Sequence, residues 1–205
     1  LNKSIDVIIP VYKPDEKLDK LIERLQKQTK KPDHIILMST RDGREEERVK
    51  KFGNVPNLSI HHIEKADFDH GGTRNLGASL SLAEFVLFMT QDAVPTDVHL
   101  IEEMLKPFEN EEVAAVYGRQ LAGKNAGEVE KYTRVFNYPE KDSVKSKKDL
   151  ERLGIKTYFC SNVCAAYRKS VYDEMGGFVL KTIFNEDMIM ASKIISAGYS
   201  IGYAA

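Results

Sequence analysis

The sequence contains few cysteines, no long apolar run and no excess of either charge. Its 205 residues include only two cysteines, which are too few for a disulfide framework and favour a reducing, cytoplasmic setting. No apolar stretch approaches the roughly 20 residues that a membrane-spanning helix requires. No segment with the features of a signal peptide opens the chain. We therefore expect neither a transmembrane segment in this chain nor a disulfide-rich fold.

The charge balance excludes a second group of functions. The chain has 30 Lys+Arg against 31 Asp+Glu, a formal net charge of -1, which provides no general attraction to nucleic acid. Hydrophobic residues make up 42% and charged residues 30% of the chain, a composition typical of a globular domain rather than of disorder. Length favours one domain of ordinary size.

Two common phosphate-binding motifs are missing after the first predicted strand. The residues there are Pro10, Val11, Tyr12, Lys13 and Pro14, which match neither G-x-G-x-x-G nor G-x-x-x-x-G-K-[ST]. The glycine- and arginine-rich loop expected of a sugar-nucleotide pyrophosphorylase is also missing. We therefore expect no Rossmann-type dinucleotide site and no P-loop.

The sequence does show a regular alternation of strand-like and helix-like segments. Short β-branched and apolar runs predict strands, and an apolar stripe with helical spacing follows the first of them at Leu18, Leu21, Ile22 and Leu25. This order predicts an α/β fold with a mostly parallel central sheet flanked by helices. The predicted strands cover residues 5–12, 34–39, 58–63, 85–90 and 113–118, and the predicted helices cover residues 15–25, 44–51, 73–82 and 100–108.

The second half of the chain is less regular. Residues 119–157 are polar and rich in Lys, Glu, Asp and Gly, which predicts an excursion within a single domain covering 1–205. Ordered structure is expected again over 158–167, followed by a helix over 186–197 and a strand over 199–203. Because this apolar strand ends the chain uncovered, we expect a domain truncated at its C-terminus.

The first segment that carries chemistry follows the predicted strand over 85–90. It reads Met-Thr-Gln-Asp-Ala-Val-Pro, with Asp92 in a polar turn. A carboxylate at the end of a buried strand suits Mg²⁺ or Mn²⁺, which takes its remaining oxygens from substrate phosphates and water. The alternative is that Asp92 caps the turn.

Two further segments combine polar residues with the start of a helix. In Asp67–Asn75, two glycines before a helix would leave backbone N–H groups open to an anion, and Arg74 adds donors suited to phosphate. An ordinary glycine turn is the alternative. Glu186 and Asp187 begin the last predicted helix, where they would act as a general base or only complement the helix dipole.

Other candidates have simpler interpretations. Three histidines and two acids lie close together in the sequence, but their spacing matches no zinc pattern; they are His61, His62, His70, Asp67 and Asp69. Cys160 and Cys164 lie among apolar neighbours and are expected to be small core residues.

Taken together, these segments resemble the family 2 glycosyltransferases with the GT-A fold, and within them the bacterial rhamnosyltransferase-like branch. The matching segments run in order along nearly the whole chain. They are IDVIIPVYKP, QT-x-x-PDHIIL, FDHGGTRNLGA, FVLFMTQDAVP, FCSNVCAAYRKSVYDEMGGF and NEDMIMASKIISAGY, of which FDHGGTRN and MTQDAVP are the most specific.

The resemblance implies a role for individual residues. Asp92 corresponds to the metal-binding acid of a DXD-type motif, with Gln91 in place of the first acid as a weaker ligand or a contact to the sugar-nucleotide. Arg74 corresponds to an arginine near the nucleotide and its diphosphate. Asp187, with Glu186, corresponds to the acid pair whose second member deprotonates the acceptor hydroxyl. Pro10, Val11 and Tyr12 would line the nucleobase pocket.

The chain departs from the family pattern at two places. Relatives often place an acid near the end of the second strand to contact the base, where this chain offers Ser39 or, from the following loop, Asp42. Relatives also place a histidine metal ligand just beyond the point where this chain ends. The donor base and the strength of metal binding are therefore left open by the sequence.

The expected function follows from the resemblance. It implies an inverting, metal-dependent glycosyltransferase that moves a sugar, with rhamnose as the candidate, from a nucleotide-diphosphate donor to a glycan or lipid-linked acceptor. The setting would be cell-surface polysaccharide synthesis, in the cytoplasm at the inner face of the membrane. The alternative is a non-catalytic GT-A domain that binds a nucleotide-sugar. Gln91 and the early end of the chain favour this alternative, whereas the intact Glu186–Asp187 pair argues against it.

Overall fold

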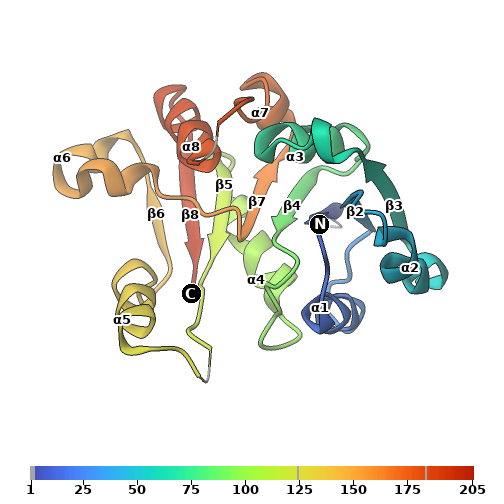
Figure 1. The fold of residues 1–205 in the computed structure, drawn as a ribbon. Coiled ribbons are helices and arrows are strands. Elements are labelled where there is room, and N and C mark those ends of the chain that lie inside the picture. Colours follow the sequence, from blue (N-terminus) through green and yellow to red (C-terminus); the bar gives the residue numbers. More distant parts are fainter. Residues whose placement is uncertain (1–2, 124, 183) are drawn as a thin grey trace.

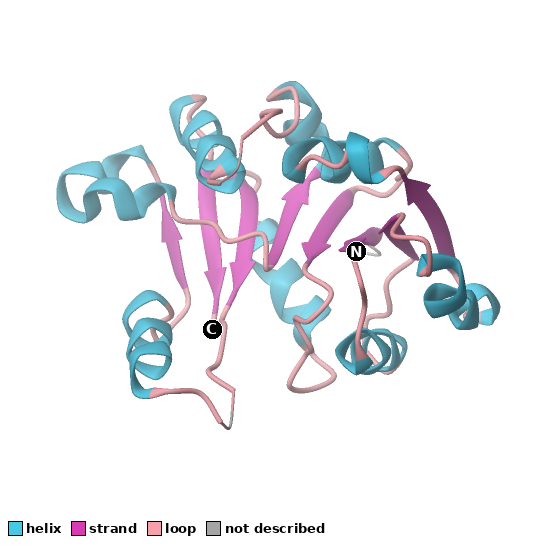
Figure 2. Cartoon of the chain, viewed as in Figure 1, coloured by secondary structure: helices cyan, strands magenta, loops and turns pink. Residues whose placement is uncertain are grey.

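The computed structural model describes residues 3–123, 125–182 and 184–205. These residues form an eight-stranded sheet with the strand order β3-β2-β1-β4-β7-β5-β8-β6. Helices cover both of its faces (Figures 1 and 2). The strands are β1 (Ile5–Val11), β2 (His34–Thr40), β3 (Leu58–Ile63), β4 (Phe85–Met89), β5 (Val113–Gly118), β6 (Ser143–Lys145), β7 (Cys164–Arg168) and β8 (Ser200–Ala204).

Most of the strands run in one direction. β1 is parallel to β2 and β4, and β2 is parallel to β3. β7 is antiparallel to both β4 and β5, so β5 and its parallel neighbour β8 run in the same direction as β4. The short β6 pairs antiparallel with β8 at one edge of the sheet. The predicted α/β fold with a mostly parallel sheet is confirmed.

Alternate side chains of each central strand enter two separate cores. In β4, Leu87 packs with α1 and α4 on one face, whereas Val86 and Phe88 pack with α3, α7 and α8 on the other. These two groups of helices lie below and above the sheet in Figure 1. The helices are α1 (Glu16–Gln26), α2 (Glu45–Val49), α3 (His70–Ser79), α4 (Leu100–Leu105), α5 (Glu128–Asn137), α6 (Leu150–Leu153), α7 (Lys169–Glu174) and α8 (Glu186–Ser196).

Short 3-10 helices extend several of these elements. They are η1 (Lys50–Asn54), η2 (Lys65–Asp67), η3 (Lys106–Glu109), η4 (Lys147–Asp149) and η5 (Gly154–Tyr158). The predicted helix over 44–51 is therefore an α-helical turn continued as η1, and the one over 100–108 is α4 continued as η3.

Helix α1 forms as its sequence predicts. The Asp15 side chain accepts a hydrogen bond from the backbone N–H of Lys17, which caps the helix. All four residues of the predicted apolar stripe, from Leu18 to Leu25, are buried against the sheet. Burial of each such side chain contributes about 1.5–3 kcal/mol.

Helix α3 begins earlier than predicted, and this corrects one inference about its glycines. Gly71 and Gly72 lie inside the first turn, and the Gly72 N–H is bonded to the Asp69 side chain at 2.6 Å. That donor is therefore not open to an anion. A Cβ on Gly71 would lie 2.2 Å from the Val179 carbonyl oxygen, and one on Gly77 would lie 2.5 Å from Ile8 Cγ2. These glycines allow α3 to pack closely.

The polar stretch over 119–157 contains secondary structure of its own. It includes α5, β6 and α6, and β6 extends the sheet through β8. Lys145 on β6 is buried, and its Nζ donates to the carbonyls of Lys156 and Phe159 at 3.1 and 2.6 Å. These bonds fix the chain just before β7.

The structure also places the two cysteines. Cys160 and Cys164 are free, buried thiols, and burial raises the pKa of each to about 12. This confirms that they are core residues. Within the described residues, no helix is long and apolar enough to cross a membrane.

Candidate functional site

The predicted site residues gather at the edge of the sheet where the parallel strands end. Ligands of open α/β sheets bind at this carboxyl edge. β7 runs the opposite way, so its first residue, Cys164, pairs with the last residue of β4, Met89. The chain entering β7 therefore lies at the same edge as the loops that leave β1, β2 and β4.

Gln91 joins the loop after β4 to the loop after β1. Its Oε1 accepts from the backbone N–H of Tyr12 at 2.9 Å, and its Nε2 donates to the Tyr12 carbonyl at 3.0 Å. Both atoms of the amide are thus used by one backbone residue. A glutamine, which carries a donor and an acceptor, satisfies this pair, whereas a carboxylate would lack the donor.

Asp92 is exposed at the mouth of a cavity of about 620 Å³. The cavity opens beneath the loop after β4 and reaches the ends of β5 and β8. Its charged lining includes Arg119 and Arg134, whose guanidinium groups suit an anionic ligand. Asp92 is therefore an exposed acid in the lining of a cavity that also contains basic side chains.

The candidate nucleobase residues lie at the ends of β1 and β2. Pro10 and Tyr12 are half-buried and Val11 is buried. Ser39 is fully buried beside Val11 in the strand register, and its Oγ has no hydrogen-bond partner among the described residues. Asp42 binds Arg48 at 2.5 Å and the Arg44 N–H at 3.0 Å. The Arg48 guanidinium holds the pKa of Asp42 below its usual range.

Arg74 and Glu186 form a buried ion pair between α3 and α8. Arg74 Nη1 lies 3.4 Å from Glu186 Oε1 and also donates to the His70 carbonyl at 2.9 Å. The two residues are only 6% and 8% exposed. Arg74 Nε has no partner among the described residues, so one donor of this guanidinium is unused.

Asp187 lies beside this pair at the start of α8. Its Oδ2 accepts from the backbone N–H of Asn162 at 3.3 Å, and its Oδ1 accepts from the Met188 N–H at 2.7 Å. Burial raises the pKa of Asp187, and the neighbouring Glu186 carboxylate raises it further, while the two N–H donors and Arg74 oppose the shift. Such a carboxylate is a stronger base than a solvated one.

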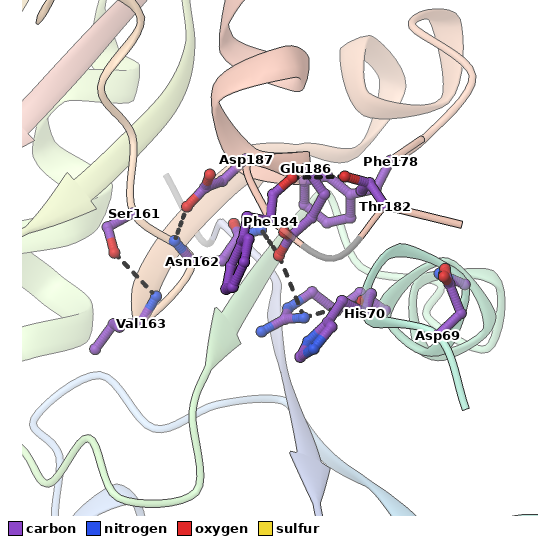
Figure 3. A network of polar contacts seen from close by, with 12 residues as sticks. Asp69, His70, Ser161, Asn162, Val163, Phe178, Thr182, Phe184, Glu186 and Asp187 are labelled. Carbon is purple, nitrogen blue, oxygen red and sulfur yellow. Dashed lines mark hydrogen bonds and ion pairs between the residues drawn. The ribbon is translucent and has the colours of Figure 1, made fainter. Parts of the chain in front are cut away.

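Asn162 is a residue that the sequence alone did not single out. Figure 3 shows it facing Asp187, between that residue and Ser161. It is buried, its Nδ2 lies 3.5 Å from Glu186 Oε1, and its Oδ1 accepts from the Tyr167 hydroxyl at 2.9 Å. The available signal was a polar pair, Ser161–Asn162, inside an otherwise apolar stretch before a strand.

The structure brings the predicted residues together in two groups joined by one turn. Gln91, Asp92 and Tyr12 form one group, and Arg74, Glu186 and Asp187 form the other. The Val163 carbonyl accepts from the Thr90 N–H at 3.1 Å, while the preceding residue, Asn162, contacts Asp187. The turn over 161–163 therefore spans the two groups.

The fit of a divalent cation rests on Asp92. Within the described part of the chain, no group of three or more His, Cys, Asp or Glu side chains could hold a metal. A single exposed carboxylate is sufficient where substrate phosphates and water supply the other oxygens, as is usual for Mg²⁺. Asp92 therefore fits a metal that arrives with a phosphate ligand.

Comparison with known sequences identifies relatives along nearly the whole chain. The family described as glycosyl transferase family 2 matches residues 6–176. The O-antigen chain rhamnosyltransferase RfbN of Salmonella typhimurium is 43% identical over 203 residues, and WbaN of Salmonella anatum, described in the same words, is 40% identical over 204 residues. Each match covers 98% of this chain but only 64% of the relative.

Solved structures share the fold at low sequence identity. TarS 1–349 of S. aureus superposes with a TM-score of 0.75 at 18% identity, covering 98% of this chain and 57% of that chain. The mannosyltransferase PcManGT of Pyrobaculum calidifontis, in complex with GDP-Man and Mn²⁺, gives a TM-score of 0.67 at 15% identity, covering 98% and 56%. At these identities the likeness shows the fold alone, the GT-A architecture.

Proposed function

The chain belongs to glycosyl transferase family 2, and we propose that it is the catalytic part of an inverting glycosyltransferase. It would move a sugar from a nucleotide-diphosphate donor to an acceptor hydroxyl during polysaccharide synthesis. The observation that carries this proposal is the half-buried Asp187 at the carboxyl edge of the sheet, with its raised pKa and its partner Asn162.

Asp187 is proposed as the general base. The acceptor oxygen forms a bond to the anomeric carbon, the sugar–phosphate bond breaks, and its electron pair leaves with the nucleoside diphosphate. The acceptor proton passes to Asp187. A positioned base of this kind typically contributes 10²–10⁴-fold to the rate. Glu186, held by Arg74 at 3.4 Å, would keep the start of α8 in place and raise the basicity of its neighbour.

Asp92 and Arg74 are proposed to act on the donor diphosphate. Asp92 would hold Mg²⁺ or Mn²⁺, and such an ion neutralises negative charge that develops on the leaving diphosphate. The mannosyltransferase neighbour is described with Mn²⁺, which supports a divalent metal without fixing the ion. The unused Nε of Arg74 supports a contact to the same anion.

The nucleobase is proposed to bind across the ends of β1 and β2. Pro10, Val11 and Tyr12 would line this pocket, with Ser39 or Asp42 contacting the base. Gln91 would act by fixing Tyr12, to which both of its amide atoms are bonded. The unpartnered Ser39 Oγ supports Ser39 as a contact.

The donor sugar is proposed to be rhamnose. The two rhamnosyltransferase relatives support this assignment, although the chain spans only 64% of their length. Their description as O-antigen chain enzymes supports a glycan or lipid-linked acceptor. We place the reaction in the cytoplasm, at the inner face of the membrane.

A binding and turnover experiment tests the proposal. Thermal unfolding would be measured with UDP-, dTDP- and GDP-sugars, each with and without Mn²⁺, and donor hydrolysis or transfer would be followed in parallel. Metal-dependent stabilisation by one nucleotide class together with turnover is the expected result. Stabilisation without turnover would instead favour a non-catalytic nucleotide-sugar-binding domain. Turnover without a requirement for metal would contradict the role of Asp92.

A further inference from the structure

The turn before β7 contains a buried amide that connects both acids of α8 to the core. Asn162 is 3% exposed, and it is separated by 24 and 25 residues from the two acids that it contacts. Its backbone and its side chain contact different acids of the pair. The N–H is directed at Asp187, and the side-chain Nδ2 is directed at Glu186 (Figure 3).

Tyr167 fixes the orientation of this amide. Its hydroxyl donates to Asn162 Oδ1 at 2.9 Å, so Oδ1 is the acceptor and Nδ2 is left to face Glu186. Tyr167 is fully buried and its ring packs edge-on against Phe88 and Phe178. The orienting hydroxyl therefore comes from a rigid part of the sheet.

Two further contacts hold the chain on either side of Asn162. The Val163 carbonyl accepts from the Thr90 N–H in the loop that leads to Asp92. Lys145 Nζ donates to the Phe159 carbonyl at 2.6 Å. A displacement of Asn162 would thus require changes at both flanks of the turn.

We propose that Asn162 is a positioning residue for the proposed transfer reaction, holding Asp187 through its backbone N–H and Glu186 through its side-chain amide. The inference rests on the proposed function, in which Asp187 accepts the acceptor proton. Both contacts favour the ionised form of an acid, because a donor stabilises a carboxylate. The Asn162 N–H thereby keeps the half-buried Asp187 ready to act as a base, while the side-chain amide holds Glu186 beside it.

Other charged or titratable groups also surround Asp187. Glu186 disfavours the Asp187 charge and Arg74 favours it. Burial raises the pKa of the remaining neighbours, which keeps them neutral where the enzyme would work; they are Cys160, Tyr138 and Tyr167. Among these groups only Arg74 opposes the effect of burial, so the N–H donors of Asn162 and Met188 supply the remaining stabilisation of the Asp187 charge.

Asn162→Asp is the most direct test, because the two side chains have nearly the same shape. The variant keeps an acceptor for Tyr167 but replaces the donor facing Glu186 with a carboxylate oxygen. We expect the pKa of Asp187 to rise by about one unit or more. The acid limb of the pH–rate profile should move upward by the same amount.

Two tyrosine variants provide a matched pair. Tyr167→Phe removes the hydroxyl that orients Asn162. It should also move the acid limb of the pH–rate profile to higher pH, but by less than Asn162→Asp does. Tyr172→Phe removes another buried hydroxyl on the same face of the sheet, which donates to Asn75 Oδ1 at 2.5 Å instead. This control should leave the acid limb in place.

The pKa of Asp187 should also be read directly by carboxyl ¹³C NMR, assigned with Asp187→Asn, since this measurement needs no substrate. If the wild type lacks transfer, the proposed function fails while the NMR titration still tests Asn162. An unchanged Asp187 titration in Asn162→Asp would overturn the inference, as would equal shifts in the two tyrosine variants. A uniform loss of rate without a pH shift would indicate a structural role only.

Discussion

Arg74 on α3 and Glu186 on α8 form an ion pair across the face of the sheet, with 3.4 Å between Nη1 and Oε1. Both side chains are almost fully buried. Arg74 also bonds the His70 carbonyl, and Asn162 contacts Glu186, so the pair belongs to a larger polar network. Through this pair, the two helix ends that contribute the predicted site residues are held together.

Removing one partner of this ion pair should destabilise the folded protein. Arg74→Met should lower the free energy of unfolding by about 3 kcal/mol or more, because it leaves the Glu186 charge buried without its partner. The double variant Arg74→Met/Glu186→Leu should be less destabilised than the single one. A double-mutant cycle in urea measures this, and simple additivity of the two changes would contradict a direct pairing.

Gln91 should stabilise the loop after β1 through Tyr12. Gln91→Ala removes two hydrogen bonds of 2.9 and 3.0 Å, each with a typical net contribution of about 1 kcal/mol. We expect a loss of about 1–2 kcal/mol in unfolding free energy, measured by urea denaturation, and weaker donor binding. Gln91→Glu keeps the acceptor for the Tyr12 N–H but loses the donor to its carbonyl, so an intermediate loss is expected. Wild-type stability in both variants would exclude this role for the amide.

Asp92 should govern the metal dependence of donor binding. Asp92→Asn keeps the shape of an exposed side chain but removes its charge, so the stability of the fold should change little. The affinity for the nucleotide-sugar should lose its response to Mn²⁺, as measured by calorimetry with and without the ion. Donor binding by the wild type that is already independent of metal would refute the assignment.

The raised pKa of Asp187 has a predictable effect on stability. Because burial raises this pKa in the folded state, the protonated carboxyl favours folding, and this contribution is lost as the pH rises through the folded-state pKa. Asp187→Asn should therefore be more stable than the wild type at pH 7. The difference should disappear below the ordinary Asp pKa of about 3.9. Denaturation over a pH series provides the comparison, and a variant that is less stable at pH 7 would show that burial does not destabilise this carboxylate.

The sequence predicted the parts of the fold that depend on local patterns. Strands β3 and β5 have the predicted bounds, and the apolar run of β5 ends at Gly118. The start of α3 was placed too late, because Gly71 and Gly72 were interpreted as a turn before the helix. In the structure, Asp69 caps a helix that already includes them. A cap can thus extend a helix through residues of low helix propensity.

The candidate site was less accessible from the sequence, because its contacts join distant residues. Asp92 and Asp187 were identified by the motifs around them. The bonds of Gln91 to Tyr12 span 79 residues, and Asn162 meets Glu186 across 24. No local pattern records such pairs, which arise only once β4 has paired with β1 and β7, and α8 has packed against the sheet.

The most direct test of the account compares chemistry and binding in Asp187→Asn. The variant keeps the shape of the side chain and one of its two accepted hydrogen bonds but cannot accept the acceptor proton. We predict a loss of transfer of about 10²–10⁴-fold, with the affinity for the nucleotide-sugar donor nearly unchanged. Transfer at the wild-type rate, or an equal loss of donor binding, would contradict the assignment of Asp187 as the base.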